Sequence, residues 1–258
     1  MNDLSGYTME EGYPQLPVYS TLFQINPSKT YKIDYEIIES YTLNNVELKN
    51  YEKNLDSPYS VYPEDNIYIS KPQVMRDLVL NQIGFIPYKY YPDESKLIVY
   101  QSVQINISES GDSNLEYFLP QKKSRVFEEL YQNSIINYER STRSEDYQAS
   151  SILYICGGNS CSNSYFQDLV EWRHKQGYIV TVVPTSESGS SENSINNYIS
   201  NAYYLWENPP EIVGLIGDTS GSYSIGYFTE NWSGYSGEGD LPYSQLDGDD
   251  FLPEVFIG

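Results

Sequence analysis

Residues 151–156 (SILYIC) form a short, mostly apolar run in which polar and apolar side chains do not alternate. Strands that are buried on both faces show this pattern, and they are typical of parallel sheets. Two similar runs follow at residues 178–183 (YIVTVV) and 212–216 (IVGLI), and helical patterns separate the three. The order strand–helix–strand–helix–strand with short connections predicts a parallel sheet with helices on its faces.

The two intervening helices have recognisable ends. Ser162 or Ser164 is expected to cap the first helix, and Gly177 occupies the usual position after its last turn. The second helix stops at residues 208–210 (NPP), and its apolar face consists of Ile195, Tyr198, Ile199, Ala202 and Trp206. Residues 186–191 are rich in serine and glycine, but no lysine follows, so they predict a flexible loop and not a phosphate-binding loop.

Apolar side chains recur with a different period in the first 118 residues. Residues 32–37 and 98–107 alternate polar with apolar side chains, which indicates strands with one buried face, and residues 74–87 predict a further strand pair. Together with prolines between these runs, the pattern predicts an antiparallel β-sandwich over residues 1–118. Residues 119–148 are expected to form a linker with a short helical segment, and residues 149–258 an incomplete α/β domain. The overall class is therefore α+β.

Charge narrows the classes of partner. The formal net charge of -21 argues against nucleic acid as a partner, because phosphate binding requires a cationic face.

No apolar run approaches the roughly 18 residues of a membrane span. The N-terminal residues lack the basic and apolar regions of a signal peptide. The apolar run at residues 255–257 continues almost to Gly258, which favours the interpretation that the chain is truncated.

An acidic cluster precedes that last run. Residues 247–254 (DGDDFLPE) place four carboxylates in one short loop, where like charges repel unless a cation neutralises them. Calcium takes roughly six to eight oxygen ligands from carboxylates and carbonyls, although the order here is not that of an EF-hand. A calcium site and a solvated acidic turn are both compatible with these residues.

The chain has two cysteines and one histidine. Cys156 and Cys161 are expected to be ordinary thiols, or a short-loop disulfide if the protein is secreted. A nucleophilic cysteine needs a nearby base, and His174 lies near the far end of the following helix. We therefore expect His174 to be a surface side chain, and the chain to contain no complete hydrolytic site.

Several sequence segments, which occur in the same order as in the family, resemble the gingipain family of cysteine peptidases. In the second half these phrases are residues 166–178 (FQDLVEWRHKQGY), 202–218 (AYYLWENPPEIVGLIGD) and 241–258 (LPYSQLDGDDFLPEVFIG). In the first half, three segments resemble the family's pro-segment: residues 12–18 (GYPQLPV), 76–88 and 96–103. The resemblance covers nearly the whole chain, and the ordered set is more specific than any one phrase.

The resemblance implies a secreted or cell-surface cysteine endopeptidase precursor with a caspase-like three-layer sheet, acting on protein or peptide substrates. In this family the catalytic histidine and cysteine follow the region at which the chain stops, so no residue here is given those roles. The resemblance also implies bound calcium (Ca2+). It leaves open whether Asp247 or Asp249 is one of the ligands. The implied ligands are Asp218, Asp247, Asp250, Glu254 and the Leu252 carbonyl.

Two alternative functions stay open at this point. The chain could be a non-catalytic, calcium-stabilised interaction module that is secreted or on the cell surface, and calcium would then raise its melting temperature. It could also be a doubly wound domain that binds a small molecule near Asp218 and residues 157–158. No nucleotide-binding fingerprint supports the second alternative.

Overall fold

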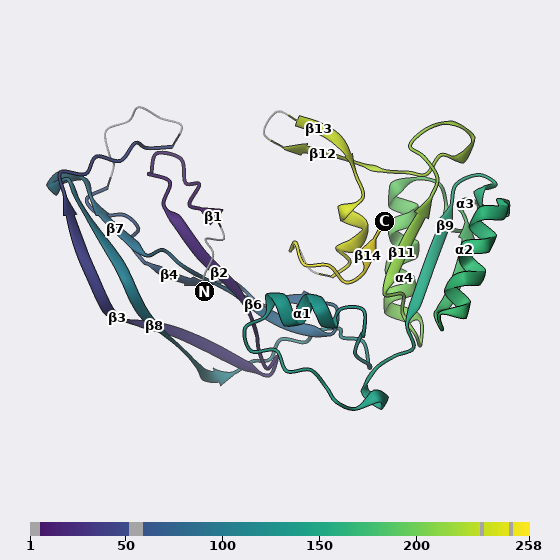
Figure 1. Ribbon diagram of the computed structural model, residues 1–258, viewed down its shortest axis with the longest axis horizontal. Helices are drawn as coiled ribbons and strands as arrows, with labels where there is room; N and C mark the ends of the chain where they lie inside the picture. Colours follow the sequence, from purple (N-terminus) through teal and green to yellow (C-terminus); the bar gives the residue numbers. More distant parts are fainter. Residues whose placement is uncertain (1–5, 52–58, 233–234, 248–249) are drawn as a thin grey trace. The chain divides into compact units, whose positions relative to one another are not determined.

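The computed structural model describes residues 6–51, 59–232, 235–247 and 250–258 (Figure 1). They form two compact units. The first unit comprises Met1–Pro72, Leu80–Glu116 and Ser134–Tyr138, and the second comprises Gln73–Val79, Tyr117–Asn133 and Glu139–Gly258. Packing thus groups two early segments, 73–79 and 117–133, with the C-terminal half, while the boundaries expected at residues 118 and 148 stay a prediction.

The first unit consists of antiparallel strand pairs, as the alternating pattern predicts. One sheet has the order β1 (Gly6–Tyr7), β2 (Pro17–Gln24), β6 (Leu78–Phe85) and β4 (Ile67–Ile69). The strand β5 (Gln73–Met75) also pairs with β6, but its residues are grouped with the second unit. The other has the order β3 (Lys29–Asn44), β8 (Lys96–Asp112) and β7 (Tyr88–Tyr91). The aromatic rings of Tyr35 and Tyr100 both contact Phe85, which joins the two sheets. The sandwich geometry stays a prediction.

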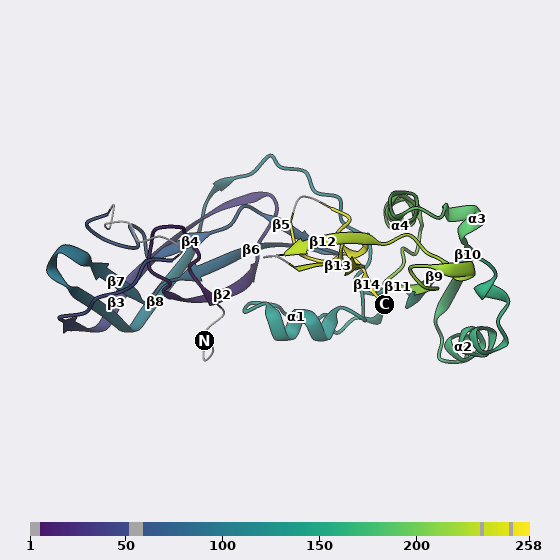
Figure 2. The ribbon, with the colours of Figure 1, turned by 90° about the horizontal axis from the view of Figure 1, so that it is seen from above.

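The second unit contains the predicted parallel sheet. Its strand order is β10 (Ile179–Pro184), β9 (Ser151–Cys156), β11 (Ile212–Ile216) and β14 (Phe256–Ile257), and all neighbours are parallel. All six residues of β9 are buried, as a central strand requires. Helices α2 (Ser164–Lys175) and α4 (Glu192–Leu205) cover opposite faces of this sheet (Figure 2).

Apolar packing explains this layering. The predicted face of α4 is buried at Ile195, Ile199 and Ala202, and it packs on the sheet residues Leu153 and Val213. On the other face, Phe166 of α2 belongs to the cluster of Ile152, Tyr154 and Cys156. The predicted helix-covered parallel sheet is confirmed, and its caspase-like character stays a prediction.

Two local predictions are wrong. Asn163, not a serine, caps α2, because its backbone is extended and its Oδ1 accepts a hydrogen bond from the Tyr165 amide at 2.9 Å. The segment expected to be a loop at residues 186–191 overlaps a short helix, α3 (Thr185–Ser188). By contrast, Gly177 follows α2 with a φ of 92°, a backbone conformation that favours glycine.

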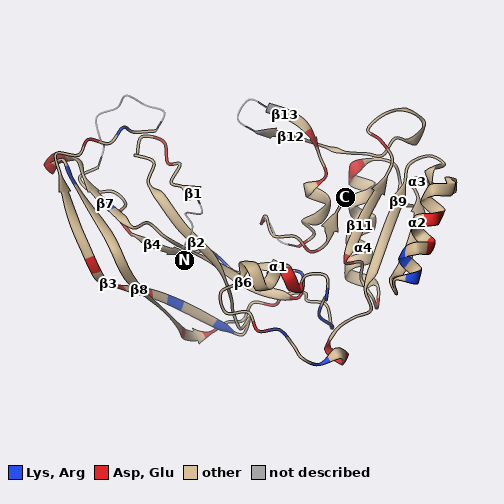
Figure 3. Ribbon diagram, viewed as in Figure 1, with Lys and Arg blue, Asp and Glu red and all other residues tan. Residues whose placement is uncertain are grey.

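The remaining elements are short. They are α1 (Glu128–Ser134), the hairpin β12 (Phe228–Trp232) and β13 (Tyr235–Gly239), and the 3₁₀ turns Pro92–Glu94, Ser144–Asp146, Ser160–Ser162, Gly221–Tyr223 and Leu241–Ser244. Within the described ranges, no helix is long and apolar enough to cross a membrane. Acidic and basic residues are scattered over the ribbons of both units, and both kinds lie on α2 (Figure 3).

Candidate functional site

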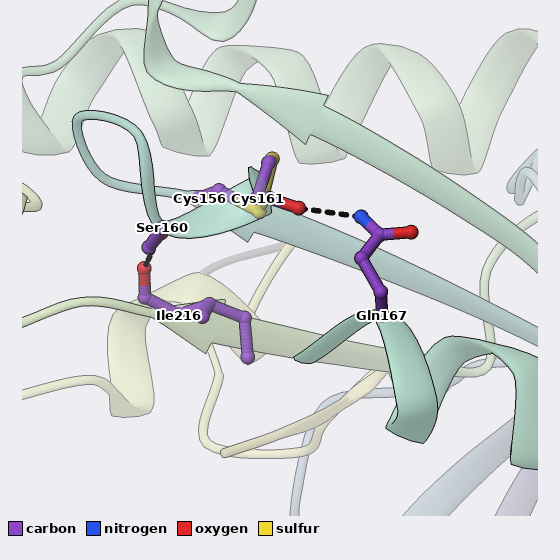
Figure 4. The surroundings of a disulfide bond; sticks show 5 residues. All are labelled: Cys156, Ser160, Cys161, Gln167 and Ile216. Atoms are coloured by element: carbon purple, nitrogen blue, oxygen red, sulfur yellow. Dashed lines mark hydrogen bonds between the residues drawn. A yellow bond between two sulfur atoms is a disulfide. The ribbon is translucent and has the colours of Figure 1, made fainter. Parts of the chain in front are cut away.

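The carboxyl edge of the parallel sheet is formed where β9 and β11 end, at Cys156 and Ile216. Cys156 forms a disulfide with Cys161, and the Ser160 hydroxyl donates a hydrogen bond to the Ile216 carbonyl at 2.7 Å (Figure 4). The side-chain amide of Gln167, on α2, donates to the Cys161 carbonyl. The loop after β9 is therefore fixed to both the neighbouring strand and the following helix.

This disulfide decides between the two alternatives for the cysteines. Both sulfurs are bonded to each other, and a disulfide sulfur is not the thiolate that nucleophilic catalysis requires. His174 is exposed near the end of α2, as expected for a surface side chain. That the chain contains no catalytic pair stays a prediction.

Two glycines allow the segment that contains Tyr223 to approach the carboxyl edge of the sheet. A Cβ at Gly157 or Gly217 would lie 2.1 or 2.4 Å from the Tyr223 carbonyl oxygen, so no other residue fits without a shift. Asp218 follows β11 here with an exposed side chain, and its Oδ1 accepts a hydrogen bond from the Thr219 amide at 2.7 Å. A hollow of about 390 Å³ lies beside Asp218, Phe166 and Tyr223.

The acidic cluster is centred on the buried side chain of Glu254. Its Oε2 accepts hydrogen bonds from the amides of Leu246 (2.7 Å) and Asp247 (3.2 Å), while its buried Oε1 has no hydrogen-bond partner within the described residues. Burial raises the pKa of Glu254 to about 8, and the nearby carboxylates of Asp250 and Asp247 also raise it. The two amide hydrogen bonds act in the opposite direction.

The expected calcium ligands fall into two places. Asp247 and Asp250 lie near Glu254, and Asp250 Oδ1 accepts a hydrogen bond from the Leu252 amide at 2.8 Å. Glu254 precedes β14, which pairs with the start of β11, whereas Asp218 follows the end of β11. At roughly 3.3 Å per strand residue, Asp218 and Glu254 are on the order of 20 Å apart, so Asp218 cannot join the other ligands.

The chemistry of the remaining set suits a hard cation, since the Glu254 Oε1, which lacks a hydrogen-bond partner among the described residues, lies near two further carboxylates. Among the residues that the structure describes, however, no three His, Cys, Asp or Glu side chains are grouped closely enough to hold a metal ion. Asp249, the alternative to Asp247, lies outside the described residues.

Comparison with known families identifies both halves. Residues 5–145 match the family model described as Propeptide_C25, and residues 133–258 match the model of Peptidase family C25. The chain belongs to the gingipain family, peptidase family C25. This gingipain-family chain thus contains a pro-segment followed by the N-terminal part of the peptidase domain.

Curated relatives agree. Gingipain R2 of Porphyromonas gingivalis is 23% identical over 96% of this chain and 36% of its own length. Gingipain R1 of the same organism is 22% identical over 96% of this chain and 26% of its own length. The chain therefore spans about a third or less of the relatives that it matches.

Two solved structures are also similar to parts of the chain. The complex of Porphyromonas gingivalis RgpB pro- and mature domains has 21% identity and a TM-score of 0.41, covering 52% of this chain and 78% of the matched one. A structure concerning the zymogenic latency of gingipain K has 13% identity and a TM-score of 0.34, covering 41% and 70%.

Sequence reasoning overlooked a buried polar group at the opposite, amino edge of the sheet. Arg76, Ser124, Gln148 and Glu211 are all buried there. The available signal was the charged pair Arg76–Asp77 inside the otherwise apolar run 74–80, which is unusual for a buried strand pair.

Proposed function

We propose that this chain is the pro-segment and the first part of the peptidase domain of a secreted or cell-surface cysteine endopeptidase that acts on protein or peptide substrates. The ordered match of residues 5–145 to the pro-segment family and of residues 133–258 to the peptidase family carries this proposal. The disulfide supports an oxidising compartment.

In this proposal the catalytic cysteine and histidine lie outside this chain, and the paired cysteines and the exposed His174 on α2 support it. In parallel sheets, ligands gather at the carboxyl ends of the strands. A thiolate held there would attack the scissile carbonyl while a histidine transfers protons. Within this chain, the disulfide loop and the segment after Gly217 would shape that edge.

The test is to express the chain together with its downstream reading frame and to measure hydrolysis of a protein substrate with and without a thiol-alkylating reagent. We expect activity that the reagent abolishes and that the double variant Cys156→Ala/Cys161→Ala retains. Alkylation-sensitive activity that disappears in a folded Cys156→Ala/Cys161→Ala protein would show that one of these cysteines is the nucleophile.

Calcium binding is the second part of the proposal, with Asp247, Asp250, Glu254 and the Leu252 carbonyl as ligands. The buried Oε1 of Glu254, for which the described part of the chain supplies no hydrogen-bond donor, supports it. We expect calorimetry to show heat on calcium addition and calcium to raise the melting temperature. Glu254→Gln should remove both effects, and Asp218→Asn should preserve them. Absence of both effects in the unaltered chain would contradict calcium binding without affecting the peptidase assignment.

A further inference from the structure

The long strand β3 lies at an edge of its sheet in the first unit. It pairs with β8 on one side, and no strand of the described residues pairs with it on the other (Figure 1). Along such an edge, the backbone N–H and C=O groups of alternate residues point away from the sheet and can bind a further strand. The β3 edge therefore offers a row of hydrogen-bonding groups to another chain.

One stretch of this edge is regular enough to pair over its whole length. In the register of β3 with β8, Ile38 is skipped on the β3 side, so a bulge interrupts the strand there. The irregularity after Thr30 skips Ser110 of β8 and leaves β3 continuous. Residues 29–37 are therefore nine consecutive positions without a bulge in β3, and Ile33 is at their centre.

The two faces of this stretch differ. On the inner face, the side chains of Tyr31, Ile33 and Tyr35 are half-buried. The two tyrosine rings contact Phe23 and Phe85 of the other sheet of this unit. On the outer face, the side chains are exposed, namely those of Thr30, Lys32, Asp34 and Glu36. An added strand must match this alternation, because a shift by one residue would place its charges on the inner face.

A second copy of the same stretch meets this requirement. When two copies pair antiparallel about a twofold axis at Ile33, Tyr31 lies opposite Tyr35 of the second copy, and Lys32 lies opposite Asp34. Aromatic pairs and pairs of opposite charge both stabilise neighbouring strands, and the twofold axis repeats each pair. Lys32 forms no ion pair within the described residues, so its ammonium group is available for this contact.

Charge disfavours the neighbouring registers that keep the faces matched. An axis at Asp34 would place that carboxylate opposite its own copy, and an axis at Lys32 would do the same with the ammonium group. An axis at Tyr35 would place Asp34 opposite Glu36. Only the axis at Ile33 joins opposite charges without a like-charged pair, and it also uses the whole of the regular stretch.

We propose that the first unit is a self-association module, in which residues 29–37 of two copies of this chain pair antiparallel about Ile33 and join their sheets. The residues that form the contact all belong to the first unit, so the proposal is independent of peptidase activity and of calcium binding. A single strand pair buries less than the roughly 1,200 Å² of a stable interface, so we expect a dissociation constant on the order of 10 to 100 µM.

Sedimentation equilibrium of the whole chain at several concentrations tests the association, and we expect a monomer–dimer equilibrium. Asp34→Lys turns both attractive charge pairs into repulsive ones and should raise the dissociation constant at least about tenfold. Lys32→Asp/Asp34→Lys exchanges the two charges and should return the constant to within about threefold of the unaltered value. Asp168→Lys, at an exposed position of α2, makes the same change in net charge as Asp34→Lys and should alter the constant no more than about twofold.

Cysteine cross-linking tests the register. Ile33→Cys places two thiols opposite each other at the twofold axis, with Cα atoms about 4.5 to 5.5 Å apart, a separation that a disulfide can span. Oxidation should therefore give a covalent dimer, whereas Asp34→Cys should give none. The two native cysteines do not interfere, because they are paired with each other.

Three results would overturn the proposal. The first is a chain that stays monomeric up to about 1 mM, well above the expected constant, even where β3 binds an unrelated strand-forming peptide. The second is a dimer that Asp34→Lys does not weaken or that Lys32→Asp/Asp34→Lys does not restore. The third is cross-linking through a cysteine at position 34 and not at position 33.

Discussion

The two edges of the parallel sheet are built in different ways. At the carboxyl edge, Cys156 pairs with a residue five positions away, and Asp218 binds the next amide in the chain. At the amino edge, Arg76, Ser124 and Glu211 come from distant stretches and are all buried. Buried polar groups must be satisfied by specific partners, so changes at the amino edge should be costly and changes at the carboxyl edge mild.

The largest effect is expected at Glu211. Its carboxylate accepts hydrogen bonds from the Ser124 hydroxyl and from the Ser151 amide (3.0 Å), and it lies close to the Arg76 charge. Glu211→Ala leaves these groups without a partner and should lower the free energy of unfolding by about 4 kcal/mol in urea titrations. Glu207→Ala, at an exposed position, is the control, and equal losses in both variants would contradict the comparison.

A pH-dependent effect is expected at Asp77. Burial raises the pKa of its carboxyl from 3.8 to about 6, and this outweighs the Tyr131 hydroxyl, which donates to it at 2.8 Å, and the charges of Arg76 and Lys123. Between these pH values the folded chain keeps a proton that the unfolded chain has released. Stability should therefore fall by about 3 kcal/mol as the pH rises from about 3 to 7.

Asp77→Asn should remove this contribution. The difference in unfolding free energy between the unaltered chain and the variant is to be measured across that pH range, and it should fall by the same amount. Asp168→Asn, on the exposed side of α2, is the control. A difference that stays constant with pH for Asp77→Asn would show that this carboxyl is not perturbed by burial.

A smaller effect is expected from the disulfide. Cys156 and Cys161 close a loop of few residues, and a short loop restricts the unfolded chain only modestly. Cys156→Ala/Cys161→Ala should lower the free energy of unfolding by about 2 kcal/mol in denaturant titrations. Adding a reductant to the unaltered chain should have a similar effect and none on the variant. A loss larger than that of Glu211→Ala would reverse the ranking of the two edges.

The smallest effect is expected at Asp218. Its side chain is exposed, and its hydrogen bond to Thr219 is local. Asp218→Asn keeps an oxygen that can accept that hydrogen bond. The free energy of unfolding, measured by thermal melting, should therefore change by no more than about 0.5 kcal/mol. A larger loss would indicate that Asp218 has a partner that its place at the carboxyl edge does not reveal.

Local pattern determined much of this fold. The mostly apolar run 151–156 and the apolar run 212–216 predicted β9 and β11 with their observed bounds, because a strand covered on both faces carries few polar side chains. The α4 face and the stop at Gly177 followed from helical spacing and from glycine's tolerance of positive φ. The α2 cap was missed because three neighbouring residues can each supply the capping oxygen.

The candidate sites depended more on tertiary structure. The acidic cluster 247–254 was visible in the sequence, but only the strand pairing showed that Asp218 lies at the other edge of the sheet from Glu254. The pairing of Cys156 with Cys161 was one of two alternatives that the sequence allowed.

The sequence by itself determined the strands β9 and β11, the helices α2 and α4, and the family, because hydrophobic periodicity and ordered sequence motifs are properties of neighbouring residues. Only the tertiary structure decided that Arg76 lies among the carbonyls of Pro209, Pro210 and Glu254. Backbone carbonyls are present in every residue, so no pattern of side chains marks three of them as a binding site. Folding alone brings them to one guanidinium.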